Sequence, residues 1–265
     1  MGRAANAGIL SAIVLHGGLA CAYFKLPTIF VLFLLHLASC FLVLSVAIAL
    51  RKPEIFGKDG DGDLPLWSRV FFWPLTAITY TSLFFFRRRR RAKECGTLTE
   101  VMPGILLGGY PNDRHAKQKV EELLSQQQDC GGGSNEVGEK TTPKYLGLTV
   151  IDVTAELTGI RKYAGATSFQ YLNLPCFDGE RPSVKAMKIA AKIVARARES
   201  SHLIVVHCTF GVGRSTTFLL AALMWMKKSS NWEDLYSDIK TKRAVVRLNK
   251  EYKAALNAFV QEMKL

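Results

Sequence analysis

The sequence predicts an α/β domain, built on a mixed, mainly parallel sheet flanked by helices and preceded by an α-helical transmembrane region. Two observations favour this fold. The first third of the 265 residues holds three long apolar runs with few charges. The remainder alternates short apolar segments typical of buried strands with segments of helical periodicity, a pattern that favours parallel strands covered by helices. We therefore expect a membrane-anchoring region at 1–93 and a second domain at 94–265.

The three apolar runs cover residues 9–24, 26–50 and 66–86. The middle run, of about 25 residues, is long enough to span a bilayer, whereas the others are shorter or interrupted. Pro74 is expected to kink the third run. Two or three helices are therefore predicted. Two alternatives stay open: the first run is a cleaved signal peptide, or the third is an interfacial or re-entrant helix.

Five consecutive arginines, Arg87–Arg91, follow the third run directly. The positive-inside rule places such a block, and the domain after it, in the cytoplasm, and the block is expected to contact anionic lipid head groups. Residues 1–93 hold 12 Lys and Arg against 4 Asp and Glu, so most of the net charge of +13 lies near the membrane. This distribution argues against a dedicated nucleic-acid-binding protein.

The second domain is expected to begin with a strand at 105–108 and a helix at 112–128. Residues 126–143, rich in Gln, Gly and Ser, are expected to form a disordered insertion. The later expected strands are 148–152, 169–174 and 201–206, and the later helices are 183–198, 214–228, 231–240 and 250–264.

The most informative motif runs from His207 to Thr216, between an apolar strand and a helix. Cys208 and Arg214 are separated by five residues, and the glycines within that interval let the backbone curl so that its amides point inward. A helix N-terminus, a guanidinium and several amides all favour a thiolate at Cys208. Arg214 supplies a planar fork for phosphoryl oxygens. Ser215 can donate a hydrogen bond to the sulfur, and His207 is expected to orient the Cys208 backbone.

This motif resembles the signature of the cysteine-dependent protein phosphatase superfamily: His-Cys, five residues, Arg, then Ser or Thr. The short domain is most similar to the dual-specificity phosphatases, from roughly Thr97 to the C-terminus. The resemblance implies a protein-tyrosine-phosphatase-like fold and hydrolysis of phosphate monoesters through a phosphocysteine intermediate, without cofactor or metal. It assigns catalysis to Cys208, Arg214 and Ser215. The substrate-binding residues that it implies are His207, Thr209, Phe210, Gly211, Val212 and Gly213.

The resemblance also implies a general acid on a loop roughly thirty residues before the cysteine. Asp178, in the segment 174–180, fits this position, with Glu180 on the same loop as the alternative. Asp152 lies at a strand end and is expected to be structural. The segment 242–249 resembles the family's brace for the phosphate-binding loop, with Arg247 and Asn249 as candidates; solvated charges near a helix cap are the other interpretation.

Six scattered cysteines without a CxxC pair indicate neither a zinc site nor a disulfide scaffold. Cys176 is close enough in the expected fold to raise the hypothesis of a disulfide with Cys208 upon oxidation, and Cys95 that of palmitoylation. A spectator thiol is the alternative for Cys176.

The five residues between Cys208 and Arg214 include no basic side chain. Multiply phosphorylated inositol lipids need extra cationic partners, so the sequence favours singly phosphorylated groups, on phosphoproteins carrying phosphotyrosine, phosphoserine or phosphothreonine. Two alternatives stay open: a phosphatase for lipid monophosphates or phosphoinositides, and a non-catalytic membrane adaptor that binds phosphorylated ligands.

Overall fold

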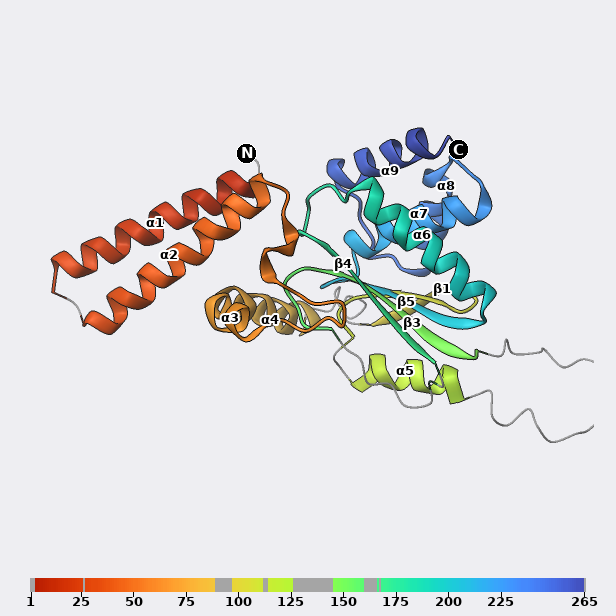
Figure 1. Ribbon diagram of the computed structural model, residues 1–265, viewed down its shortest axis with the longest axis horizontal. Helices are drawn as coiled ribbons and strands as arrows, with labels where there is room; N and C mark the ends of the chain where they lie inside the picture. Colours follow the sequence, from red (N-terminus) through yellow and green to blue (C-terminus); the bar gives the residue numbers. More distant parts are fainter. Residues whose placement is uncertain are drawn as a thin grey trace, which may run out of the picture. The chain divides into compact units, whose positions relative to one another are not determined.

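The computed structural model describes residues 3–25, 27–88, 97–111, 114–125, 145–159, 166 and 168–264 (Figure 1). The chain divides into two compact units, Met1–Lys58 with Leu64–Thr81 and Asp59–Asp63 with Ser82–Leu265. Three of the segments discussed above lie outside the described residues: Arg89–Arg91, Cys95 and the insertion at 126–143.

In the first unit, α1 (Arg3–Tyr23) and α2 (Thr28–Ala49) run side by side (Figure 1). Two serine hydroxyls join them, because Ser11 Oγ donates to Ala38 O (2.8 Å) and Ser45 Oγ donates to Ala4 O (2.7 Å). Within the described part of the chain, these two helices are long and apolar enough to cross a membrane. A short 3₁₀ helix, η1 (Pro53–Phe56), follows them.

The third apolar run is not one continuous helix. It divides at Phe72 into α3 (Leu66–Phe71) and α4 (Trp73–Arg88), with Pro74 in the first turn of α4, where proline is tolerated because no helical partner awaits its missing N–H. A kink was expected at Pro74; the structure instead has a break between two helices at Phe72, two residues earlier. At 16 residues, α4 is about 24 Å long, shorter than the roughly 30 Å of a bilayer's hydrocarbon core.

The second unit contains a five-stranded sheet in the order β1-β2-β5-β3-β4. β1 (Leu98–Met102) pairs antiparallel with β2 (Ile105–Gly108), and all the other pairs are parallel. The remaining strands are β3 (Gly147–Thr154), β4 (Phe169–Cys176) and β5 (His202–His207). The mixed, mainly parallel sheet is thus confirmed, and β1 is the strand that the sequence did not reveal.

Helices cover both faces of this sheet (Figure 1). One face carries α5 (Arg114–Ser125), which packs on Leu203 and Val205 of β5. The opposite face packs through Ile204 and Val206, and its helices are α6 (Val184–Glu199), α7 (Arg214–Lys227), α8 (Trp232–Lys242) and α9 (Lys250–Met263). Successive side chains of a strand point to opposite faces, which explains this division.

The central strand β5 leads directly into the loop 208–213, called the Cys208 loop below, and then into α7. In parallel sheets, ligand sites lie beyond the carboxyl ends of the strands. The fold therefore places the expected phosphate-binding loop at the middle of that edge, next to the ends of β2 and β3.

Candidate active site

The Cys208 loop curls around the sulfur of its first residue. Gly211 N donates to Cys208 Sγ (3.2 Å), and Ser215 Oγ, from the first turn of α7, donates to the same sulfur (3.3 Å). Both donors direct a hydrogen bond at this sulfur from a fixed position in the fold. The start of α7 adds the positive end of a helix dipole at the same point. The sequence-predicted cysteine and serine are thus in contact.

Close packing against the end of β2 fixes the shape of the loop. Cys208 N donates to Gly108 O (3.3 Å), and Tyr110 N donates to Thr209 O (3.0 Å). Gly211 has a φ of 67°, and a Cβ there would lie 2.3 Å from the carbonyl carbon of Gly108. Glycine is therefore required at 211 both for its conformation and for space.

A buried arginine braces the loop from the segment between α8 and α9. Arg243 Nε donates to Gly211 O (2.9 Å), while its Nη1 donates to Thr97 O (3.2 Å) and Thr99 Oγ1 (2.9 Å). The side chain of Arg247 is exposed, and only its main-chain N reaches the loop, at Val212 O (2.9 Å). The brace expected from the sequence thus exists, but its side chain is that of Arg243.

Arg214 is buried and held by a carboxylate that the sequence did not single out. Its Nη2 donates to Glu156 Oε1 (2.8 Å) and Thr209 Oγ1 (2.6 Å), and its Nη1 donates to Glu156 Oε2 (3.0 Å) and Cys176 O (2.8 Å). This fork-to-fork pairing fixes the plane of the guanidinium. The sequence offered one signal for Glu156: it follows the end of β3, the strand that lies beside β5.

The ion pair also sets the charge of both partners. Burial would raise the pKa of the Glu156 carboxyl, but the Arg214 guanidinium and hydrogen bonds from Arg214 and Thr209 outweigh it and hold that pKa below its ordinary value. Burial acts to lower the pKa of Arg214, and the nearby Glu156 and Asp178 carboxylates raise it well above its ordinary value. Both groups are therefore ionised at neutral pH.

Asp178 lies beside the arginine, on the loop between β4 and α6. Its Oδ1 is 3.5 Å from Arg214 Nε, and its side chain is 53% exposed. Tyr252 of α9 donates its hydroxyl proton to Asp178 Oδ1 (3.3 Å) and accepts from Gly179 N (2.7 Å). Asn249 Nδ2 donates to Gly179 O (2.9 Å). The candidate Asn249 therefore supports the Asp178 loop rather than the Cys208 loop.

Glu180, the alternative acid, contributes its main-chain carbonyl to this region, where it accepts from Cys176 Sγ (3.8 Å). The structure thus brings Asp178, the first choice from the sequence, next to Arg214.

The candidate His207 is fully buried under the loop. Its Nε2 lies 3.9 Å from Asp152 Oδ2, and its ring packs near that of Tyr110, with centroids 6.1 Å apart. Asp152 also accepts from Thr154 Oγ1 (2.7 Å) and from Tyr171 Oη (2.6 Å). These contacts agree with a structural role for Asp152 and with a supporting role for His207.

The mouth of the site is apolar. Phe210 and Val212 are the partly exposed members of the Cys208 loop, whereas Thr209, Gly211 and Gly213 are buried. The ring of Phe210 packs against that of Phe86 in α4, with centroids 5.0 Å apart.

Comparison with known proteins agrees with this geometry. Residues 136–262 match the family described as dual specificity phosphatase, catalytic domain. This match covers just under half of the chain, and together with the relatives described below it supports a cysteine-dependent phosphatase in this chain. Its phosphatase domain is of the protein-tyrosine and dual-specificity type.

Two curated relatives show the extent of the similarity. The dual specificity protein phosphatase Mpk3 of Drosophila melanogaster is 26% identical over 136 residues, which are 51% of this chain and 32% of that protein. Dual specificity protein phosphatase 22 of Homo sapiens is 22% identical over 167 residues, 61% of this chain and 73% of that protein. The match thus spans about a third of the length of Mpk3.

Among solved structures, PTPMT1 in complex with PI(5)P aligns with a TM-score of 0.48 and 17% identity, covering 63% of this chain and 96% of that one. Human DUSP28 aligns with a TM-score of 0.46 and 17% identity, covering 63% and 95%.

In the phosphatase domain, the second buried cysteine, Cys176, differs from Cys208 in its surroundings. Its Sγ donates to Phe177 O (3.4 Å), and burial raises the pKa of its thiol to about 12. Since the thiolate is the form that attacks sulfur or peroxide, Cys176 is poorly suited to react. The structure therefore favours the spectator interpretation of this cysteine.

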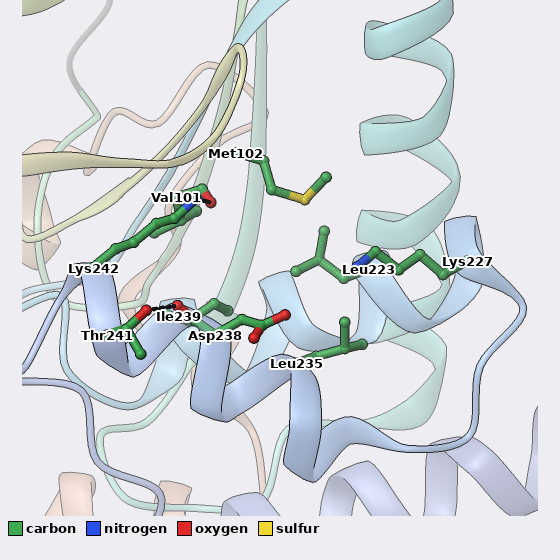
Figure 2. Close-up of a pocket in the computed structure, with 9 residues that line it drawn as sticks. All are labelled: Val101, Met102, Leu223, Lys227, Leu235, Asp238, Ile239, Thr241 and Lys242. Carbon is green, nitrogen blue, oxygen red and sulfur yellow. Dashed lines mark hydrogen bonds between the residues drawn. The ribbon is translucent and has the colours of Figure 1, made fainter.

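The phosphatase domain also has a cavity of about 250 Å³ far from the Cys208 loop (Figure 2). It lies at the C-terminal end of α7, about 20 Å along the helix from Arg214, and is lined by side chains including Met102, Leu223 and Leu235. Lys242 spans its edge, donating to Val101 O (2.8 Å). This cavity is separate from the residues assembled around Cys208.

Proposed function

We propose that the protein is a membrane-anchored phosphatase that hydrolyses phosphate monoesters, with its phosphatase domain facing the cytoplasm. Cys208 is the nucleophile, Arg214 binds the phosphoryl oxygens, and Asp178 is the general acid and base. Ser215 stabilises the thiolate whenever Cys208 is the leaving group.

The proposed reaction has two steps. In the first, the Cys208 thiolate attacks phosphorus, the P–S bond forms, the P–O bond breaks, and Asp178 gives its proton to the leaving oxygen. In the second, water attacks the phosphocysteine, Asp178 takes a proton from that water, and Cys208 departs as a thiolate with inorganic phosphate released. The hydrogen bond from Ser215 Oγ to Cys208 Sγ (3.3 Å) makes the sulfur a better leaving group in this step.

One observation carries the proposal: a buried sulfur accepts hydrogen bonds from a loop amide and a hydroxyl at the start of a helix, beside an ionised arginine. A structural thiol in a core requires none of these donors. Preorganised donors of this kind stabilise charge that develops during phosphoryl transfer.

The proposed substrates are phosphoproteins with single phosphate groups, because the interior of the Cys208 loop has no cation for a second phosphate. One observation favours the lipid alternative. Phe86, from the helix that ends in the arginine block, packs against Phe210 at the mouth. A phosphate monoester of a membrane lipid is therefore the second candidate.

The test is phosphate release by the full chain in lipid nanodiscs, with phosphopeptides, lipid monophosphates and phosphoinositides as substrates. We expect Cys208→Ser to abolish turnover and Asp178→Ala to lower kcat roughly a hundredfold. Cys176→Ser is the matched control, because it alters another buried cysteine among the described residues of the phosphatase domain and should retain activity. A folded protein that binds phosphorylated ligands without releasing phosphate would instead support the adaptor hypothesis.

A further inference from the structure

The last two turns of α4 are built into the phosphatase domain. Leu83 is 3% exposed and packs in a cluster with Tyr110 and Leu157, and Phe210 of the Cys208 loop packs against that cluster. Phe86 adds the ring contact with Phe210. Leu83 and Phe86 are three residues apart, so they share one face of the helix, and that face packs beside Phe210 of the Cys208 loop.

The other face of the same turns is apolar and exposed. Phe84 and Phe85 are 51% and 59% exposed, and they point away from the Leu83 face because successive helical residues are rotated by about 100°. No acidic residue occurs in α4, and the sequence continues through the five arginines Arg87–Arg91.

Exposed aromatic residues directly followed by a basic block are suited to binding the surface of an anionic bilayer. Aromatic rings settle at the boundary between head groups and acyl chains, and clustered arginines attract anionic head groups. The two apolar helices earlier in the same chain provide a further reason for a bilayer to be near.

We propose that the end of α4 is a lipid-docking surface, through Phe84 and Phe85, and that it seats the mouth of the Cys208 loop on an anionic bilayer. This consequence rests on the proposed phosphatase activity: docking favours the second substrate candidate, phosphate monoesters of lipids in that bilayer, over the phosphoproteins. The substrate then approaches a mouth that is already held at the level of the head groups, which raises its effective concentration.

The docking is tested first without reference to activity. The variant Phe85→Trp is prepared in the full chain. Its tryptophan fluorescence in anionic vesicles that contain brominated lipid is compared with that of the parent protein. We expect the added fluorescence to be quenched. Ile189→Trp is the control, because Ile189 is an exposed apolar residue (38%) on α6 of the same unit. If the fluorescence added at 85 is quenched no more than that added at 189, the docking surface is refuted.

The consequence for substrates is tested by a ratio of rates in nanodiscs. The rate on phosphatidic acid in the same bilayer is divided by the rate on a soluble aryl phosphate. We expect Phe84→Ser with Phe85→Ser to lower this ratio about tenfold, and Ile189→Ser to leave it unchanged. An unchanged ratio in the double variant overturns the inference. If the parent hydrolyses neither substrate, the proposed function fails, whereas the quenching experiment still decides the docking.

Discussion

Replacing Arg243 with alanine tests whether the side chain of Arg243, and not that of the nearby Arg247, holds the Cys208 loop in place. The change removes three hydrogen bonds from a guanidinium, to Gly211 O, Thr97 O and Thr99 Oγ1. It also leaves the Gly211 carbonyl without this donor, in a region where the Arg243 side chain was fully buried.

The expected loss of stability follows from these contacts. A hydrogen bond to a charged donor contributes about 1.5–3 kcal/mol, but three bonds from one side chain are not additive, and we expect the free energy of unfolding to fall by about 4 kcal/mol. For a domain of this size, that corresponds to a midpoint of thermal unfolding lower by roughly 10 °C.

Activity should fall beyond the loss of stability. Gly211 donates its N–H to Cys208 Sγ while its carbonyl is held by Arg243, so the same residue links the brace to the nucleophile. Releasing the carbonyl loosens the backbone on one side of Gly211, so its N–H is no longer fixed toward the sulfur, and we expect kcat to fall roughly tenfold or more. Phosphate release is measured well below the unfolding midpoint of the variant, and stability is measured by urea unfolding.

Arg247→Ala is the matched control. Its side chain is exposed, and the bond from its main-chain N to Val212 O is retained, so the free energy of unfolding should change by no more than about 0.5 kcal/mol. If Arg243→Ala behaves like Arg247→Ala in both assays, or if both variants lose kcat equally, the assignment of the brace to the buried arginine is refuted.

Three further changes test the rest of the site. Glu156→Gln should lower the free energy of unfolding by about 3 kcal/mol at neutral pH, because it removes the bidentate carboxylate partner of buried Arg214 and leaves only the half-exposed Asp178 beside it. The pKa of Glu156 is lower in the folded state than in the unfolded state, where it is about 4.3. The stabilisation by Glu156 is therefore complete above the unfolded pKa and is lost as the pH falls through the lower, folded pKa. The free energies of unfolding of the parent and the variant, measured in urea against pH, should therefore converge in acid. Tyr252→Phe should lower kcat about fivefold, and most for poor leaving groups, because Asp178 loses a donor; equal losses for good and poor leaving groups would contradict this. Cys176→Ser should leave the rate of inactivation by hydrogen peroxide unchanged, since its thiol stays protonated, and mass spectrometry of the oxidised parent should show no disulfide at Cys176.

Much of the phosphatase domain could be predicted because its signals are local. β5 carries four consecutive apolar residues, 203–206, and Gly211 and Gly213 mark a tight loop before α7. β1 could not be predicted in the same way. It is a five-residue strand at the edge of the sheet that carries Thr99 and Glu100, so its apolar pattern is too short to stand out.

The supporting residues of the site could not be predicted because they act across the fold. Glu156 is 58 residues from Arg214, and no spacing rule connects a carboxylate after β3 to an arginine at the start of α7. Arg243 and Arg247 lie in the irregular segment between α8 and α9. Without a helical or strand period, the sequence does not show which of the two points inward.

The boundary between the apolar N-terminal region and the phosphatase domain depends on packing more than on charge. The arginine block marks where apolar sequence ends, which is why residue 93 was the expected boundary. The compact unit nevertheless includes Asp59–Asp63 and begins again at Ser82. Gly159 N donates to Gly62 O (2.6 Å), and a Cβ at Gly62 would lie 2.5 Å from Tyr171 Oη, so that loop fits against β4 with no room for a side chain.

The packing of Leu83 also indicates that the domain begins before the arginine block. A fragment that starts at residue 94 lacks this side chain and would expose the apolar surfaces of Leu157 and Tyr110 that it covers. Charge marks where the apolar sequence ends, whereas buried contacts show where a domain starts, and here the expected boundary at residue 93 and the start of the compact unit at Ser82 differ by 11 residues. Within that segment, the side chains of Leu83 and Phe86 pack near Phe210 of the Cys208 loop, so any displacement of these two side chains also acts on the mouth of the site.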